Sequence, residues 1–371
     1  MSFNEWKEVK LEDVVDTISK RHKFDKDKII LINTSDVLEG KVLNHEYVQN
    51  ENLKGQFKKS FQKNDILYSE IRPQNKRFAY VDFQSDDYVA STKLMVLRKK
   101  NEMITSNFLY QILKSDDLIN ELQVIAESRS GTFPQITYNE LSRMKIKLPP
   151  LDEQKAIAHI LSTLDDKIEV NNEINKTLEN MAQAYFDDMF PNVAAGDTTI
   201  GEYITPKRGK NLLSKDAISG EVPVIAGGLS PATYHNVSNT QSPVITISAS
   251  GANAGFVNLW TVPVWSSDSS FIDYGMTKDV YFWYVMLKKR QKEIYDSQTG
   301  SAQPHIYPKH ITIMPTIKLN VDEINLYTKR VTPLFKKIAN NLYEISKLQL
   351  IRDTLLPKLM SGEIRVPLKT E

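Results

Sequence analysis

The stretch LPPLDEQKAIAHILSTLDDKIEV, residues 148–170, decides the fold. Two prolines are followed by a run without glycine or proline, in which apolar residues recur at helical spacing. This pattern predicts a long regular helix in the middle of the chain. A weaker copy, LNVDEINLYTKRVTPLFKKIANN, occupies residues 319–341 and predicts a second helix near the end.

The two helices belong to an internal repeat with a shift of 170 residues, in which Leu151-Asp152-Glu153 aligns with Val321-Asp322-Glu323. Earlier blocks recur in the same order. ILYSEIRPQNKRFAYV (66–81) resembles VITISASGANAGFV (244–257), FLYQILKS (108–115) resembles FWYVMLKK (282–289), and SGTFPQI (130–136) resembles TGSAQPHI (299–306). Ordered matches over half of a chain indicate one unit written twice.

Each half is predicted to be a globular region of short strands and turns followed by a long helix. One amphipathic helix is expected near residues 106–127 and its partner near 278–296. The predicted fold class is α+β, with two similar mixed α/β domains separated by two long antiparallel coiled-coil helices in an internal pseudo-twofold repeat. The predicted boundaries are 1–148 for the first domain, 149–190 for the first spacer helix, 191–318 for the second domain, and 319–371 for the second helix and a C-terminal tail.

A heptad seam can be followed through both helices. Alternating steps of four and three residues from Ile157 reach ten positions, of which eight are Ile, Leu, Ala, Tyr or Met and two are Asn. The same steps from Tyr327 reach Leu359, so both helices are predicted to be coiled-coil partners. Pro333 lies inside the second pattern and is expected to kink or restart that helix.

Asn171 and Asn341 are equivalent seam positions. A buried Asn fixes the register of a coiled coil because only another polar group satisfies it. We expect the two residues to face each other near a pseudo-twofold axis. The alternative is that both lie on solvated faces of irregular helices. The seam from Ile157 to Met189 would be about 48 Å long, which suits a spacer between DNA half-sites about 34 Å apart.

Composition limits the function classes. Lys and Arg total 47 and Asp and Glu total 46, so the net charge of +1 neither indicates nor excludes nucleic-acid binding. The absence of cysteine excludes disulfides and cysteine-based zinc sites. The N-terminus lacks an apolar signal segment, and no run of 18 apolar residues occurs, so we expect a cytoplasmic protein that does not bind a membrane.

Catalytic motifs are missing from the sequence. It contains no G-x-x-x-x-G-K-[ST] loop, no G-x-G-x-x-G after a strand and no G-x-S-x-G elbow. Pro149-Pro150 follows Leu148, whereas amino-methyltransferases place Asp or Asn before two prolines. His305 and His310 lack a third metal ligand nearby. We therefore expect no catalytic residue and no metal site on this chain.

Polar and basic residues in the expected loops could contact DNA. Arginine can read guanine and asparagine can read adenine, while glycine-containing turns let backbone N–H groups approach phosphates. Each of these residues could equally belong to a solvated turn. The candidates are Arg72, Asn75, Lys76, Arg77, Ser91, Thr92, Lys93, Thr132, Gln135, Lys207, Arg208, Lys210, Ser248, Ser250, Asn253, Ser267, Ser301, Gln303 and His305.

The repeat, the phrase LPPLDEQKAIAHILSTLDDKIEVNN and the tail LIRDTLLPKLMSGEIRV resemble the specificity subunit of type I restriction-modification systems. The resemblance covers nearly the whole chain. Residues 148–190 match the central conserved region of that family, and residues 350–366 match its distal one. At the second helix, LNVDEIN replaces LPPLDEQ, which puts its capping and its partner contact in doubt.

The resemblance implies a non-catalytic subunit with two target recognition domains, each of which reads half of a split, asymmetric sequence in double-stranded DNA. It implies that the helices set the gap and bind two methyltransferase (modification) subunits, which together form an adenine-N6 methyltransferase. Added restriction (motor/nuclease) subunits, up to two, would make an ATP-dependent endonuclease. S-adenosylmethionine, ATP and magnesium would then bind to the partners and not to this chain.

Residues on the outward faces of the helices are candidates for the methyltransferase contact: Asp152, Glu153, Gln154, Lys155, His159, Asp166, Glu323 and Arg352. Two other function classes compete with DNA recognition. A coiled-coil adaptor with protein-binding heads would lack the salt-dependent DNA affinity of a recognition subunit. A fused restriction-methylation enzyme would need a methyltransferase motif, and this sequence has none.

Overall fold

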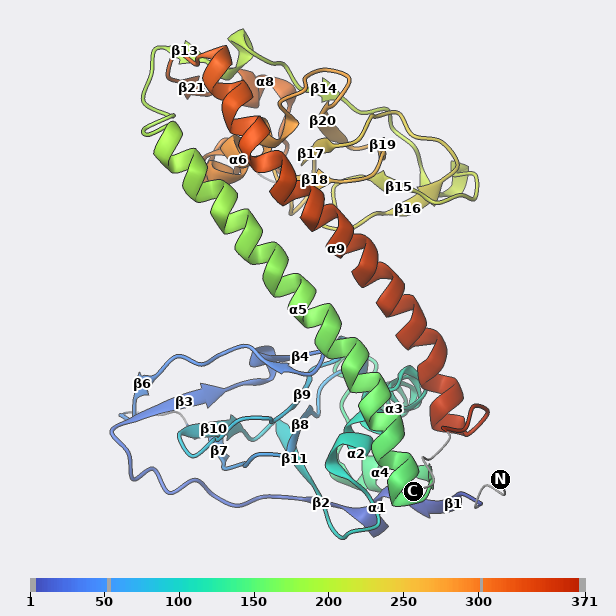
Figure 1. The fold of residues 1–371 in the computed structure, drawn as a ribbon. Helices are drawn as coiled ribbons and strands as arrows, with labels where there is room; N and C mark the ends of the chain where they lie inside the picture. The colour runs from blue at the N-terminus through green and yellow to red at the C-terminus, as the bar shows by residue number, and fades with distance from the viewer. Residues whose placement is uncertain (1–4, 52–54, 301–302, 367–371) are drawn as a thin grey trace. The chain divides into compact units, whose positions relative to one another are not determined.

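The computed structural model describes residues 5–51, 55–300 and 303–366 of the chain. The chain divides into two compact units. Unit 1 comprises residues 1–168 and 346–371, and unit 2 comprises residues 169–345. Each unit therefore combines one mixed α/β region with a part of each long helix (Figure 1).

Unit 1 contains two four-stranded sheets. The first sheet is antiparallel with the order β2-β11-β8-β9. The second sheet has the order β6-β3-β10-β7, and β3 and β10 in it are parallel. The strands are β1 (Lys7–Lys10), β2 (Val15–Thr17), β3 (Lys28–Ile32), β4 (Val37–Leu38), β5 (Lys41–Val42), β6 (Val48–Gln49), β7 (Phe57–Lys59), β8 (Ile66–Ser69), β9 (Phe78–Tyr80), β10 (Tyr88–Ser91), β11 (Leu94–Lys99) and β12 (Lys145–Leu148).

Unit 2 repeats this topology. Its antiparallel sheet has the order β14-β20-β17-β18, and its second sheet has the order β16-β15-β19 with β15 and β19 parallel. A two-stranded sheet β13-β21 matches β1-β12 of unit 1. The strands are β13 (Thr198–Thr199), β14 (Lys207–Arg208), β15 (Val222–Ile225), β16 (Thr233–His235), β17 (Val244–Ser248), β18 (Val257–Trp260), β19 (Trp265–Ser266), β20 (Ser269–Asp273) and β21 (Pro315–Thr316). The predicted repeat of mixed α/β regions is confirmed.

Each expected amphipathic helix is divided in two. In unit 1, α2 and α3 are separated at Ser115, whose hydroxyl accepts a hydrogen bond from the Leu118 N–H and so begins a new helix. In unit 2, α6 and α7 are separated at Arg290. The helices of the mixed regions are α1 (Leu11–Val14), α2 (Ser106–Leu113), α3 (Asp116–Arg129), α4 (Tyr138–Ser142), α6 (Val280–Lys289), α7 (Gln291–Asp296) and α8 (Pro308–Thr312).

The two predicted long helices are present as α5 (Leu151–Met189) and α9 (Val321–Ser361). All twenty seam positions reached by the heptad steps are buried or half-buried, as coiled-coil packing requires. Pro333 was expected to kink or restart the second helix, and the restart is wrong, because α9 continues through it. Pro333 is exposed, whereas Val331 and Phe335 on either side are fully buried and hold the helix in place.

The helix segments within each unit run antiparallel. In unit 2 the Tyr327 hydroxyl donates to the carbonyl oxygen of Ala182 at 2.9 Å. In unit 1 the Arg352 guanidinium donates to the Asp165 carboxylate at 3.1 Å. Residue numbers rise along one helix as they fall along the other, so each mixed region packs on the start of one helix and the end of the other.

The seam asparagines are buried, and each forms a hydrogen bond with a residue other than its repeat partner. Asn341 donates from Nδ2 to Oδ1 of Asn175 at 2.8 Å, and Asn171 donates from Nδ2 to Glu344 at 2.9 Å. Asn171, Asn175 and Asn341 are 1%, 8% and 0% exposed. With the shift of 170 residues, Asn175 aligns with Ile345. The hydrogen-bonded pair Asn175–Asn341 therefore has no equivalent pair in the repeat.

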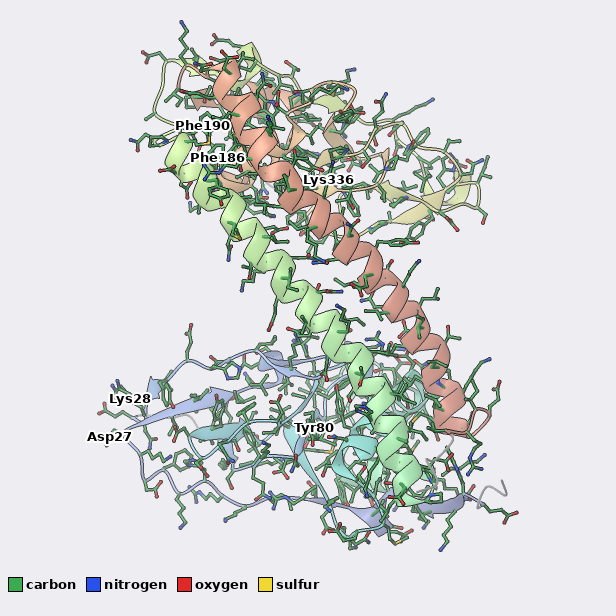
Figure 2. All side chains as sticks on the ribbon, in the orientation of Figure 1. Asp27, Lys28, Tyr80, Phe186, Phe190 and Lys336 are labelled. Carbon is green, nitrogen blue, oxygen red and sulfur yellow. The ribbon has the colours of Figure 1, made fainter. Side chains whose placement is uncertain are left out.

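Aromatic side chains dominate the core of unit 2. Phe186, on the last turn of α5, and Phe190, directly after its end (Figure 2), pack with Phe282 of α6 at ring-centroid distances of 5.6 and 5.0 Å. In unit 1, the helix residues Ile157, Leu161 and Leu359 join the core of the mixed region. Full burial of one such side chain contributes about 1.5–3 kcal/mol to folding, so both long helices are integral parts of their units.

Two residues predicted on the outward face of the first helix lie inside unit 1. Glu153 is 2% exposed and accepts hydrogen bonds from Arg365 at 2.6 and 2.8 Å and from the Trp6 indole at 3.2 Å. Gln154 is fully buried and bonds to the backbone of Met103 and Thr105. The helical pattern does not show that the tail and the N-terminal strand cover this turn.

Candidate nucleic-acid interface

The turn between β8 and β9 carries the first group of candidate residues in unit 1. Arg72 has a left-handed backbone, with φ of 44°, which directs the chain away from the sheet. Its N–H donates to the carbonyl oxygen of Pro134 at 3.0 Å, and its guanidinium reaches the carbonyl oxygen of Thr132 at 3.4 Å. The structure therefore places Arg72 and Thr132 side by side, although about 60 residues separate them in the sequence. Asn75 is exposed in the same turn.

Lys93 is the centre of a second polar group beside this turn. Its ammonium group lies 3.4 Å from the Glu70 carboxylate and 3.4 Å from the side-chain oxygen of Gln135. An isolated bridge pairs Ile71 with Gln135, which connects this group to the Arg72 turn. Four sequence candidates, Arg72, Lys93, Thr132 and Gln135, thus come together at one end of the sheet.

Lys59 supports the turn that carries Lys93. Its ammonium group donates to the carbonyl oxygens of Thr92 at 3.0 Å and Leu94 at 2.7 Å. Burial lowers the pKa of Lys59 from its ordinary value, and the nearby Glu70 carboxylate opposes this effect. The Ser91 hydroxyl is buried and accepts a hydrogen bond from the Lys93 N–H at 3.3 Å. These contacts fix the path of the turn.

Two other basic candidates of this loop are held by protein partners. Lys76 forms an ion pair with Asp116 at 2.8 Å. Arg77 donates to the carbonyl oxygens of Ser35 at 3.0 Å and Val37 at 3.4 Å. Both side chains therefore tie the β8–β9 turn to neighbouring segments.

Asp268 is the centre of the corresponding group in unit 2. It lies between β19 and β20, and its Oδ1 accepts a hydrogen bond from Nη2 of Arg208 at 2.5 Å. Its Oδ2 accepts a hydrogen bond from the Ser250 hydroxyl. An isolated bridge joins Ser250 to His305, whose ring is stacked on Tyr307. Arg208, Ser250 and His305 therefore share one place in the unit.

The remaining candidates of unit 2 surround this group or support it. Lys207, Lys210 and Gln303 are exposed, and Asn253 is half-buried in the turn after β17. The Ser248 and Ser267 hydroxyls are buried and donate to the carbonyl oxygens of Ala226 and Leu212, at 3.4 Å each. Ser301 lies outside the described residues. The DNA contacts of all these residues stay predictions.

The two groups are built on matching backbone hydrogen bonds. In unit 1 the Glu70 N–H donates to the backbone carbonyl oxygen of Lys93 at 3.0 Å. In unit 2 the Ala249 N–H donates to the backbone carbonyl oxygen of Asp268 at 3.1 Å. The Arg72–Pro134 bond has its match in a bond from Gly251 N–H to Pro304 at 3.1 Å. Lys93 and Asp268 thus occupy equivalent positions with opposite charges.

Sequence reasoning did not single out Glu70 or Asp268 for a role in these groups. Asp268 directly follows the candidate Ser267, and Glu70 lies two residues before the candidate Arg72. Their roles become visible only when the partners Lys93 and Arg208, distant in the sequence, are brought beside them.

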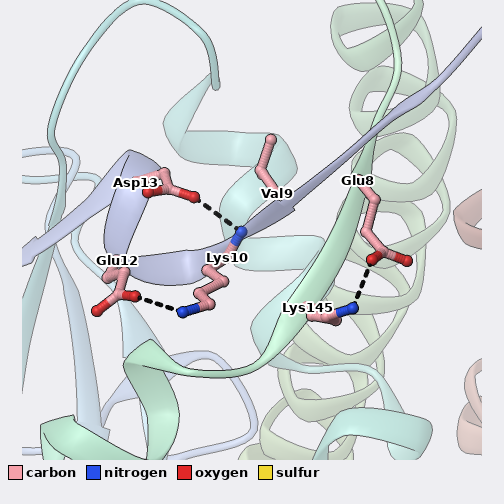
Figure 3. A pocket seen from close by; sticks show the side chains of 6 residues that line it. All are labelled: Glu8, Val9, Lys10, Glu12, Asp13 and Lys145. Carbon is pink, nitrogen blue, oxygen red and sulfur yellow. Dashed lines mark hydrogen bonds and ion pairs between the residues drawn. The ribbon is translucent and has the colours of Figure 1, made fainter.

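Among the described residues, no group of three or more His, Asp or Glu side chains could hold a metal ion. A shallow pocket beside β1 is lined by paired charges, including Lys145 with Glu8 and Lys10 with Glu12 (Figure 3). The hydrogen bond from Lys145 lowers the pKa of Glu8. In the described part of the chain, no helix is long and apolar enough to span a membrane.

Comparisons with known proteins find similar chains and a similar fold. The family model "Type I restriction modification DNA specificity domain" matches residues 4–180. The HindI specificity subunit of Haemophilus influenzae is 41% identical over 225 residues, which are 60% of this chain and 49% of that protein. The match thus spans about half the length of that relative. The MjaIX specificity subunit of Methanocaldococcus jannaschii is 26% identical and is matched over 71% of this chain and 70% of its own.

Among solved structures, the type I restriction-modification S subunit from M. genitalium has the same fold. The comparison has a TM-score of 0.60 and 21% identity, and it covers 100% of this chain and 98% of that one. The chain is therefore similar to specificity subunits of type I restriction-modification systems in sequence, and it shares the fold of one of them over its whole length.

Proposed function

We propose that this chain is the non-catalytic DNA-recognition subunit of a type I restriction-modification complex. Unit 1 and unit 2 each read one half of a split, asymmetric sequence in double-stranded DNA. The observation that carries the proposal is the pair of equivalent loop groups, which share backbone hydrogen bonds but differ in side chains. A constant framework with different donors and acceptors reads different base pairs, because base edges are distinguished by their donor and acceptor patterns.

The two halves of the proposed reading surface have different chemistry. In unit 1, Lys93 and Gln135 present donors and an amide, and Arg72 lies beside them. In unit 2, the corresponding position is the acidic Asp268, which binds Arg208. A difference in charge at one equivalent position supports different half-sites and therefore an asymmetric target.

The long helices are proposed to set the distance between the half-sites and to dock two methyltransferase subunits. Their seams are buried, and their other faces are exposed along most of their length, which leaves surface for partner helices. The burial of Glu153 and Gln154 removes these two from the contact residues. S-adenosylmethionine, ATP and magnesium are proposed to bind to the methyltransferase and restriction subunits.

DNA binding as a function of salt tests the proposal. The full chain, assembled with the methyltransferase subunit of its own system, is mixed with a pool of randomised duplexes at several salt concentrations. The proposal predicts enrichment of one split motif and a steep fall in affinity as salt rises. Binding that shows no sequence enrichment, or no DNA binding at low salt, would favour a protein-binding adaptor instead.

A further inference from the structure

The guanidinium of Arg208 is held in one orientation on the surface of unit 2. Arg208 lies on the edge strand β14, opposite Ser270 of β20. Asp268 accepts its Nη2 hydrogen bond at 2.5 Å, and the Ser250 hydroxyl donates to the second oxygen of the same carboxylate. Arg208 and Ser250, from two different segments of the chain, therefore meet at the Asp268 carboxylate of a third.

This arrangement has little value for folding. The Arg208 and Asp268 side chains are 41% and 32% exposed, and ion pairs at such positions contribute little to stability. Arg290 of the same unit is a contrast, because its side chain is 2% exposed and also donates to the carbonyl oxygen of Pro315. Arg290 fastens the fold, whereas Arg208 is fixed at the surface with its charge accessible.

The chemistry of a fixed guanidinium selects one base. Arginine has five N–H donors in a planar fork, and the hydrogen bond recorded to Asp268 uses one of them. In the major groove, guanine presents two acceptors, O6 and N7, whereas adenine presents one acceptor and one donor. An arginine already held by a carboxylate loses less conformational freedom when it binds than a free one. Guanine is thus the base that fits.

The turn next to Ser250 is open at Gly251. Gly251, next to Ser250, has φ of 81°, and a side-chain carbon placed there would meet no atom within 4 Å. The surface beside the group is therefore open. Lys207 and Lys210 flank Arg208 and are exposed, which suits phosphate contacts on either side.

We infer that Arg208 reads a guanine in the half-site recognised by unit 2, and that Asp268 and Ser250 are its positioning residues. The inference rests on the proposed function. Unit 1 has Lys93 in the position of Asp268, so this device belongs to unit 2 and distinguishes the two half-sites. A plain phosphate contact by Arg208 is the competing role, and it predicts a loss of affinity without any change in sequence preference.

The test separates charge from geometry at Arg208. The full chain, in complex with the methyltransferase subunit of its system, is bound to randomised duplexes, and the enriched motif is compared between variants. Arg208→Lys keeps the charge but loses the fork. We therefore expect near-normal affinity for duplexes without guanine at the contacted position, and a loss of roughly 5- to 100-fold in preference for guanine there. Asp268→Asn should weaken the preference at the same position by a smaller factor.

Lys292→Ala is the matched control, because Lys292 forms an exposed ion pair with Asp296 in the same unit, and its motif should be unchanged. An unchanged motif in Arg208→Lys and Arg208→Ala would overturn the inference. A uniform loss on all sequences, or a motif without guanine in the affected half, would do so too. In each of these cases the wild-type complex still enriches a split motif, so the proposed function survives. If the wild-type complex enriched no motif at all, both the inference and the proposed function would be refuted.

Discussion

The buried amide pair Asn175–Asn341 makes a sharp prediction about the coiled coil. Leucine has the same number and branching of side-chain heavy atoms as asparagine, so Asn→Leu changes polarity more than shape. In unit 2 the pair shares one hydrogen bond of 2.8 Å. Within the described residues, Nδ2 of Asn175 and Oδ1 of Asn341 are buried without a partner.

The magnitudes follow from these contacts. Asn341→Leu alone breaks the hydrogen bond and leaves Oδ1 of Asn175 unpaired, which costs about 1–3 kcal/mol before the gain from burying leucine. The double variant Asn175→Leu with Asn341→Leu removes every unpaired polar atom of the pair. We expect each single variant to lower the free energy of unfolding by about 1 kcal/mol and the double variant to equal or exceed the wild type by up to about 2 kcal/mol.

Urea unfolding followed by tryptophan fluorescence measures this, because Trp260, Trp265 and Trp283 lie in the unit that contains the pair. The coupling free energy in the 175/341 double-mutant cycle should be about 2–4 kcal/mol, which is the change in the double variant minus the sum of the two single changes. The matched control is the 171/341 cycle, in which the two residues bond to different partners. A larger coupling in the control cycle than in the 175/341 cycle would refute the pairing and restore a direct contact between Asn171 and Asn341.

Three further predictions concern unit 1. Arg365→Ala should lower the free energy of unfolding by about 2–4 kcal/mol, because it leaves the buried Glu153 carboxylate without its cation. Thermal unfolding measures this loss, and adding Glu153→Gln should recover part of it. Tyr68→Phe should raise stability by up to about 1 kcal/mol, since the Tyr68 hydroxyl is buried without a partner. Burial raises the pKa of Tyr68. The stability of the wild type should therefore fall above about pH 10, because the tyrosine loses its proton in the unfolded chain but keeps it in the folded one. Urea titrations should show a smaller fall for the Tyr68→Phe variant. Arg72→Ala and Asn75→Ala should each change sequence preference in one half-site only in duplex selection, and uniform weakening would instead mark the loop as a phosphate clamp.

The fold was largely predictable because its signals are periodic or repeated. A shift of 170 residues exposed the two-fold repeat, and the heptad steps from Ile157 and Tyr327 found seam positions that are all buried or half-buried. Local features that depend on contacts with distant parts of the chain were not predictable. Glu153 appears solvated in the helical pattern, yet Arg365, 212 residues away, covers it. Pro333 was expected to kink or restart α9, but the helix is continuous through it, between the buried neighbours Val331 and Phe335.

The candidate site was predictable in outline but not in its pairings. Loop composition pointed to Arg72, Lys93 and Gln135, and these side chains come together at one end of the sheet. Composition could not show that Lys76 and Arg77 are engaged by Asp116 and by backbone carbonyls. Partners of this kind depend on which distant segments the topology places beside a loop.

Methylation mapping tests the central claim most directly. Cells that carry the methyltransferase subunit of this system, with and without the full chain, would be compared by single-molecule sequencing of their DNA. The account predicts N6-methyladenine at one split, asymmetric motif only when the chain is present, and a change in one half of that motif in the Arg208→Lys variant. The same methylation with and without the chain, or methylation at a single unsplit motif, would contradict the account.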